Sequence, residues 1–164
     1  MAKPSSDSWN GCPIRYGSTV LGDAWALLIL RDMVFKGTRH FGEFVASGER
    51  ISTNILADRL ARLEAEGVID RAPDPDNAVR VIYRLTQKGR DLVPVLLAII
   101  DWSARWDPAT EVPKPFTEAY REDPQGFAAA VIRDLETGEL EAGEEVRSGE
   151  TRDTPRRRKT SSGR

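Results

Sequence analysis

The hydrophobic positions between residues 50 and 69 recur with the period of an α-helix. At about 100° per residue, three leucines fall within one narrow sector and form a single buried stripe. These are Leu56, Leu60 and Leu63. Ser52 can cap the start of the helix with its hydroxyl, and Gly67 can end it in the left-handed conformation. The pattern predicts a helix over residues 52–66 with one apolar side.

The opposite side of this helix is small and polar, because it carries Asn54, Ala57, Asp58 and Ala61. Such a face can enter a groove with little steric bulk. Asn pairs bidentately with adenine, and Asp accepts from cytosine N4, in the major groove of DNA. An ordinary amphipathic surface helix has the same pattern, so the neighbouring segments have to decide between the two interpretations.

The preceding residues predict further helices and a tight turn. Residues 12–21 read as a short first helix, and residues 24–35 are apolar nearly all round, as in a central core helix. Residues 39–46 predict a short helix and residues 47–49 a turn. A short helix, a tight turn and a capped helix form a helix-turn-helix.

Two short strands are predicted after this motif, at residues 68–72 and 80–85. Residues 73–77 supply turn chemistry without an apolar anchor, so we expect an exposed loop there. The fold class is therefore mainly α with a small β-hairpin, a winged helix-turn-helix. Arg80, near the tip of this wing, either reaches the DNA backbone or minor groove or is a solvated edge charge.

The segment at residues 87–106 is apolar on more than one face, and Pro94 should bend it. One small domain covers only one of these faces. We therefore expect the other face to meet a second copy of the chain, giving a homodimer that forms through terminal helices. The expected interface residues are Leu92, Leu96, Ile99, Trp102 and Trp106.

Composition divides the chain into four parts. Residues 1–11 are polar, and we expect a flexible N-terminus. Residues 12–106 hold the winged helix and the dimerisation helix, and residues 107–137 combine a linker with one extra helix that starts near Asp123. Residues 138–164 are charged, and we expect a disordered tail.

The totals exclude several classes of function. The chain has 164 residues with net charge −2, and no apolar run approaches the roughly 20 residues of a bilayer helix. The N-terminus lacks an apolar signal-peptide region, so we expect a cytoplasmic protein without membrane contact. One cysteine and one histidine leave little material for a disulfide, a zinc site or a catalytic triad. We expect no enzymatic activity, no metal and no cofactor.

Local charge changes the picture given by the total. Acidic residues crowd between residues 118 and 150, whereas arginines are spread through the first half. A local basic surface binds phosphate whatever the overall charge is. The expected contacts to the DNA backbone are Arg39, His40, Arg59, Arg62 and Arg80. For Arg59, an ion pair with Glu43 or Asp32 is an equal alternative.

Several motifs occur in order at the spacing of one known family. They are Cys12-Pro13, Gly22-Asp23 before Trp25, residues 27–32, Arg39 with Phe41-Gly42-Glu43, Ile51-Ser52, Leu56 with Arg59-Leu60, Leu63-Glu64, Gly67, Arg80-Val81 with Tyr83, Leu85-Thr86, Gly89, Pro94 and Trp102. Residues 12 to about 106 resemble the HxlR family of bacterial winged-helix transcription regulators, relatives of the MarR group. The resemblance implies a homodimer that regulates transcription by binding a two-part operator in double-stranded DNA.

Two departures from the family fall on the outward face of the predicted recognition helix. The family commonly has Pro-Lys where this chain has Thr53-Asn54, and often Thr-Gln where it has Ala57-Asp58. We therefore expect an operator different from those of better known members. The residues after Asp107 lie outside the resemblance.

Some members of the family sense electrophiles or oxidants through the cysteine that precedes proline, the position of Cys12. A thiol near a helix N-terminus ionises more readily. Without a second cysteine, oxidation gives a link to the partner's Cys12, a mixed disulfide or a sulfenic acid. The alternative is a buried structural cysteine. A small-molecule or redox effector is thus a candidate partner.

The sequence favours a dimeric, sequence-specific DNA-binding regulator, more often a repressor than an activator. The residues expected at base edges are Ser52, Thr53, Asn54, Ala57 and Asp58. The alternative is a winged helix that binds other proteins through the same face without specific DNA binding. Binding by such a module would lack the steep salt dependence that counterion release gives to DNA binding.

Overall fold

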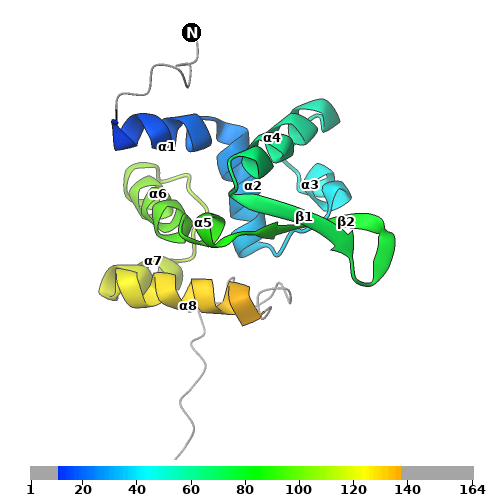
Figure 1. The fold of residues 1–164 in the computed structure, drawn as a ribbon. Helices are drawn as coiled ribbons and strands as arrows, with labels where there is room; N and C mark the ends of the chain where they lie inside the picture. The colour runs from blue at the N-terminus through cyan, green and yellow to red at the C-terminus, as the bar shows by residue number, and fades with distance from the viewer. Residues whose placement is uncertain (1–10, 138–164) are drawn as a thin grey trace, which may run out of the picture.

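The computed structural model describes residues 11–137 (Figure 1). The elements follow in the order α1 (Pro13–Leu21), α2 (Ala24–Phe35), α3 (Phe41–Ala46), α4 (Thr53–Ala65), β1 (Ile69–Asp74), β2 (Asn77–Leu85), α5 (Gln87–Arg90), α6 (Val93–Trp106), α7 (Lys114–Glu122) and α8 (Pro124–Thr137). The antiparallel strands β1 and β2 form the wing, so the predicted fold class is confirmed. The flexible N-terminus expected over residues 1–11 lies almost entirely outside the described residues, as does the whole tail from residue 138.

The predicted recognition helix is present with its predicted caps. The Ser52 hydroxyl accepts the N–H of Ile55 at 3.3 Å at the start of α4. Gly67 ends the helix at a φ of +67°, a conformation that glycine adopts without the steric cost other residues bear. The three leucines of the stripe are buried in the core, as predicted. α2 runs through the centre of that core and contributes Leu30, Met33 and Val34.

The wing is longer than predicted, and its turn is shorter. Ladder pairing runs from Ile69 opposite Leu85 to Asp74 opposite Asn77, with an irregularity between Pro73 and Asp74. Asp74 was expected in an exposed loop but is buried. Burial of this carboxylate is tolerated because it accepts the N–H of Asp76 and contacts a histidine of the helix-turn-helix, as described below.

The single helix predicted over residues 87–106 is two helices. α5 ends at Arg90, and α6 starts afresh with Pro94 in its first turn. Proline has no N–H to donate, so it is tolerated in a first turn but not in a helix interior. Pro94 therefore marks a restart, and the expected bend within a continuous helix is wrong.

α6 has one face inside the protomer and one outside. Val93, Leu96 and Leu97 are buried, because positions three and four apart share one side of a helix. Leu96, only 6% exposed, was predicted to contact a second copy; that prediction is wrong, because its side chain is already in the protomer core. The large apolar side chains on the outer face are Val95, Ile99, Trp102 and Trp106.

The extension after residue 107 contains two helices, not one. The helix predicted near Asp123 is α8, whereas α7 forms where the sequence predicts a linker. Pro113 and Pro115 occupy the N-cap and first turn of α7, where proline starts a helix rather than preventing one. Figure 1 shows α7 and α8 beside α6, away from α4.

Aromatic rings join this extension to the core. The Phe116 ring of α7 packs edge-on against the Phe35 ring of α2, with 6.2 Å between the ring centroids. It also packs edge-on against the Phe127 ring of α8, with 5.0 Å between the centroids. Arg121 donates through Nε to the carboxylate of Asp101, a buried residue of α6, at 2.5 Å. The extension thus covers the inner side of α6. None of the helices within residues 11–137 has the length and apolar character to cross a bilayer.

Replacing Phe116 by alanine should test this packing. We expect the free energy of unfolding to fall by about 3 kcal/mol, because a buried ring with two aromatic neighbours is lost. Glu118→Ala, an exposed change on the same helix, should stay within about 0.5 kcal/mol. Urea unfolding measures both; equal effects, or a separate early transition of the extension, would contradict this packing.

Candidate nucleic-acid interface

The outward face of α4 is open to solvent. Burial of the leucine stripe against α2 turns the opposite side of the helix away from the core. The five residues predicted at base edges are all exposed: Ser52, Thr53, Asn54, Ala57 and Asp58. The face is therefore continuous and carries no long side chain, so an incoming groove would meet little steric obstruction.

Arg59 fixes the orientation of α4. Its Nε donates to Oδ2 of Asp23 at 2.8 Å, and its Nη1 also pairs with Asp58. Asp23 caps α2 with its other oxygen, which accepts the N–H of Trp25 at 2.9 Å. The hydrogen bond from Arg59 holds the pKa of Asp23 below its ordinary value, and the same bond raises the pKa of Arg59. One carboxylate thus joins the start of α2 to the middle of α4.

The expected ion pair of Arg59 is therefore present, but its predicted partners are wrong. Glu43 faces His40, and Asp32 pairs with Arg31 at 2.6 Å. A partner 36 residues away cannot be read from helix spacing, because it depends on how α4 crosses the start of α2.

Two other arginines predicted to contact DNA donate hydrogen bonds to backbone carbonyls within the protomer. Arg39 donates through Nη1 to the carbonyl of Met33 at 2.6 Å, near the end of α2. Arg62 donates through Nη2 to the carbonyl of Thr19, so it connects α4 to α1. A phosphate would have to compete with these carbonyls, and a role for either arginine on DNA stays a prediction.

Two exposed arginines, one on the wing and one in the turn before α4, are candidates for contact with phosphate. Arg80 projects from β2, and no hydrogen bond or ion pair of its guanidinium occurs within residues 11–137. Arg50 lies in the turn before α4, is also exposed, and adopts a φ of 56°, where an L-residue is strained. Sequence reasoning did not single out Arg50. The only available signal was its position two residues before the cap Ser52.

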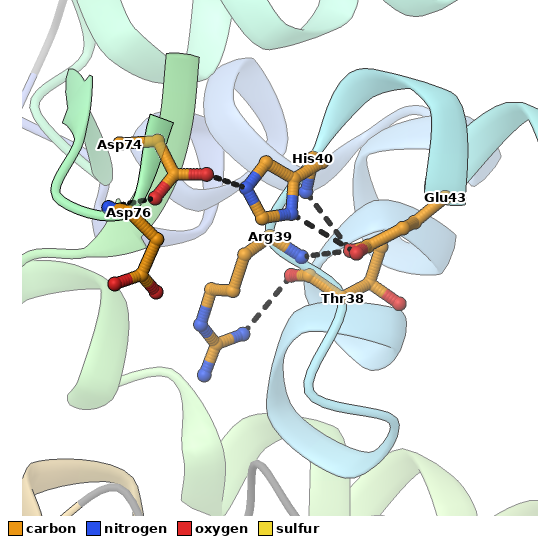
Figure 2. A network of polar contacts seen from close by, with 6 residues as sticks. All are labelled: Thr38, Arg39, His40, Glu43, Asp74 and Asp76. Atoms are coloured by element: carbon orange, nitrogen blue, oxygen red, sulfur yellow. Dashed lines mark hydrogen bonds and ion pairs between the residues drawn. The ribbon is translucent and has the colours of Figure 1, made fainter. Parts of the chain in front are cut away.

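His40 lies between two carboxylates (Figure 2). Its Nδ1 is 3.0 Å from Oε1 of Glu43, and its Nε2 is 2.8 Å from Oδ2 of Asp74 at the end of β1. Glu43 also reaches back to the N–H groups of Arg39 and His40, as the third residue of a capped helix commonly does. Both ring nitrogens of His40 are thus engaged by carboxylates, and its expected contact with phosphate stays a prediction.

The charges of this cluster support one another. Hydrogen bonds to Glu43, and next to Asp74, raise the pKa of His40 above its ordinary value. Burial alone would raise the pKa of Glu43, but the N–H groups of Arg39 and His40 outweigh it and hold that pKa low. The N–H of Asp76, followed by the ring of His40, lowers the pKa of Asp74.

A second feature lies away from α4, between α1 and α6. A hollow of about 500 Å³ there is lined mainly by apolar side chains, including Ile14, Leu92, Val95 and Ile99. Cys12 precedes α1 and is exposed, so the alternative of a buried structural cysteine is wrong. Sequence patterns alone had placed Leu92 and Ile99 together but had not included Ile14.

Comparison with known proteins identifies the family. Residues 20–111, more than half of the chain, match the family model described as HxlR-like helix-turn-helix. The chain belongs to this HxlR-like family. The resemblance found in the sequence is therefore confirmed.

Relatives in the family are named as regulators. The uncharacterized HTH-type transcriptional regulator sll1512 of Synechocystis sp. is 36% identical over 105 residues, which cover 64% of this chain and 77% of that protein. YvaP of Bacillus subtilis, named in the same way, is 37% identical over 91 residues, covering 55% of this chain and 83% of YvaP. This HxlR-like chain is a helix-turn-helix transcriptional regulator and not an enzyme.

Solved structures agree with this assignment. The crystal structure of PA1607, described as a candidate transcription factor, is 38% identical with a TM-score of 0.59, covering 66% of this chain and 75% of that one. The reduced form of the redox regulator HypR is 27% identical with a TM-score of 0.50, covering 57% of this chain and 92% of HypR. Both support a winged helix as the common core.

Proposed function

We propose that this regulator binds double-stranded DNA as a homodimer, with α4 of each protomer in the major groove of one half of a two-part operator. The observation that carries the proposal is the open outward face of α4, held in place by the buried leucines and by the Arg59–Asp23 pair. Thr53, Asn54 and Ala57 are the nearest candidates for base edges, with Ser52 at the helix start. Asp58 would accept a hydrogen bond from a base while it remains paired with Arg59.

The wing and the turn before α4 supply the backbone contacts in this proposal. Arg80 on the wing and Arg50 in the turn before α4 are exposed cations. Arg80 would meet the backbone or the minor groove beside the base-reading helix. Arg39, His40, Arg59 and Arg62 act mainly by holding the framework, as their internal bonds suggest.

The outer face of α6 supports a homodimer. Trp102 is 59% exposed and Trp106 73% exposed, and the apolar hollow beside α1 continues this surface through Ile99 and Val95. A contiguous exposed apolar surface of this kind marks an interaction site, and a twofold dimer is the commonest way to cover it. We assign residues 12–106 to DNA binding and dimerisation. The two α4 helices would then lie about one turn of DNA, or a small multiple, apart.

We propose repression as the outcome of binding. A dimer that occupies an operator needs no further contact to block transcription, whereas an activator must also recruit the transcription machinery. The exposed Cys12 is the candidate for an oxidant- or electrophile-responsive group, and the structural likeness to HypR, a redox regulator, supports that role. With one thiol in the chain, the modified states are a link to the partner's Cys12, a mixed disulfide or a sulfenic acid.

Two substitutions separate base reading from backbone contact. Arg80→Ala should weaken binding to all sequences alike and lower the salt slope by roughly one, because one phosphate contact is lost. Asn54→Ala should instead relax the preference at one base pair by roughly 1–3 kcal/mol. Titrations against an operator and its single-base variants, with Arg133→Ala on α8 as control, measure this. A uniform effect of both substitutions would contradict the assignments.

The dimer surface can be tested on the same protein. Ile99→Glu and Trp102→Glu should give monomers in sedimentation equilibrium, because each places a charge on the apolar face of α6. Val79→Glu is the matched control, since Val79 is 95% exposed on the wing, and this variant should remain dimeric. A monomeric wild-type protein, or dimers of all three variants, would contradict the proposed interface.

The role of Cys12 has a direct test. Diamide should release the wild-type protein from its operator, because oxidation needs the thiol, and Cys12→Ser should remain bound under the same treatment. Gel-shift titration with and without diamide measures this difference. Equal release of the two proteins would overturn the redox proposal.

A further inference from the structure

The wing is attached to the helix-turn-helix at two levels. Near the base of the wing, the N–H of Tyr83 donates to the carbonyl of Arg39 at 2.8 Å, and the Tyr83 ring meets Phe44 edge-on at 6.3 Å. Farther out, the ring of His40 contacts Asp74, the last residue of β1 (Figure 2). The outer attachment is polar and joins residues 34 positions apart in the chain.

Apolar packing does little to hold the outer part of the wing. Val79 is 95% exposed and Val81 42% exposed. An open groove of about 440 Å³ separates α3 from β2 and is lined by His40, Glu43, Arg80, Val81 and Tyr83, among others. The position of Arg80 relative to α3 therefore depends on polar contacts across this groove.

Asp74 connects His40 to the turn of the wing through its two carboxylate oxygens. One carboxylate oxygen, Oδ2, faces His40, while the other, Oδ1, accepts the N–H of Asp76 at 2.9 Å. This second bond shapes the turn from which β2 begins at Asn77, three residues before Arg80. A change at the His40 contact is thus connected by a short run of backbone to the exposed arginine.

The two contacts of His40 are complete together only when the ring is protonated. Both ring nitrogens of His40 lie within 3.0 Å of a carboxylate oxygen. A neutral imidazole carries one N–H, so one of its nitrogens would turn a lone pair toward an oxygen, whereas an imidazolium donates from both. The second proton therefore lets the ring donate to both carboxylates and adds a charge attraction between α3 and the wing that the neutral ring lacks.

We propose that the His40–Asp74 contact is a latch that holds the wing against α3 and places Arg80 for its contact with DNA. His40 and Asp74 are positioning residues, because they act through Arg80 rather than on DNA. The inference rests on the proposed function, since it needs Arg80 to touch DNA.

The latch makes DNA binding depend on pH. The charged or titratable groups around His40 are Glu43 on α3, the neighbouring Arg39, Asp74 and Asp76 of the wing turn, and Arg80 and Tyr83 of β2. The pKa of His40 is raised above 6.5 in the fold. The latch is therefore complete below pH 6.5 and weakens as pH rises through the raised pKa. DNA affinity should fall over the same window.

A direct attraction between the imidazolium and DNA would give the same pH trend, so a substitution at Asp74 has to separate the two explanations. Without a latch, Asp74→Asn removes a negative charge near DNA and should strengthen binding. With the latch, the same change should weaken binding. Asn keeps an oxygen that can accept the N–H of Asp76, so the turn itself is preserved.

The experiment compares Asp74→Asn with Asp76→Asn, an identical change two residues away without a contact to His40. Operator affinity is measured at several salt concentrations, below and above the pKa of His40. The pKa itself is followed by NMR in the protein without DNA, where the chain's single histidine gives an unambiguous signal. Arg80→Ala and the double variant Asp74→Asn/Arg80→Ala complete the set.

The latch predicts a lower pKa of His40 in Asp74→Asn and an unchanged one in Asp76→Asn. Asp74→Asn should lose affinity by a factor no larger than that of Arg80→Ala, with a shallower pH dependence. The double variant should bind no more weakly than Arg80→Ala alone, because both act on one contact. Asp76→Asn should not lose affinity.

Three results would overturn the latch alone. One is an unchanged pKa of His40 in Asp74→Asn, and another is equal DNA affinity of the two asparagine variants while Arg80→Ala still weakens binding. The third is additive losses in the double variant, which would show that Asp74 does not act through Arg80. A wild-type protein without salt-dependent DNA binding would instead overturn the proposed function and the inference that rests on it.

Discussion

The arrangement depends on the burial of one leucine stripe of α4. Leu56, Leu60 and Leu63 are all within the core, and each such burial contributes about 1.5–3 kcal/mol. Because the three side chains lie on one side of the helix, their burial decides which residues face outward. The polar face that we assign to DNA is thus a consequence of core packing, and a rotation of α4 that exposed Asn54 less would also expose leucine.

Polar contacts fix the orientation of α4 in addition to the burial of its leucines. Arg59 connects α4 to the cap of α2, and Arg62 connects it to α1, so the helix is fixed in rotation and tilt. Several cations that a linear reading assigns to DNA therefore make bonds within the protomer. The contacts with phosphate that we propose fall on the exposed Arg50, just before the recognition helix, and on Arg80 of the wing.

What could be predicted from the sequence was local. The cap at Ser52, the end at Gly67 and the leucine stripe follow from residues a few positions apart, and the structure confirms them. Contacts between distant segments could not be predicted, because nothing in helix spacing brings His40 to the wing or Arg59 to the start of α2. Proline was also misread at two places: in α6 and α7 it starts a helix, whereas sequence reasoning treated it as a bend and as a linker. The roles of the interface residues stay predictions.

The most direct measurement is a selection of bound fragments from sheared DNA of the source organism by the purified, reduced protein, followed by the affinity of the best fragment against salt concentration. Two open α4 faces in a twofold dimer predict a shared, twofold-symmetric sequence and a steep decrease of affinity with salt, because neutralised phosphates release counterions. No enrichment at low salt would contradict the account. It would assign the outward face of α4 to a protein partner instead.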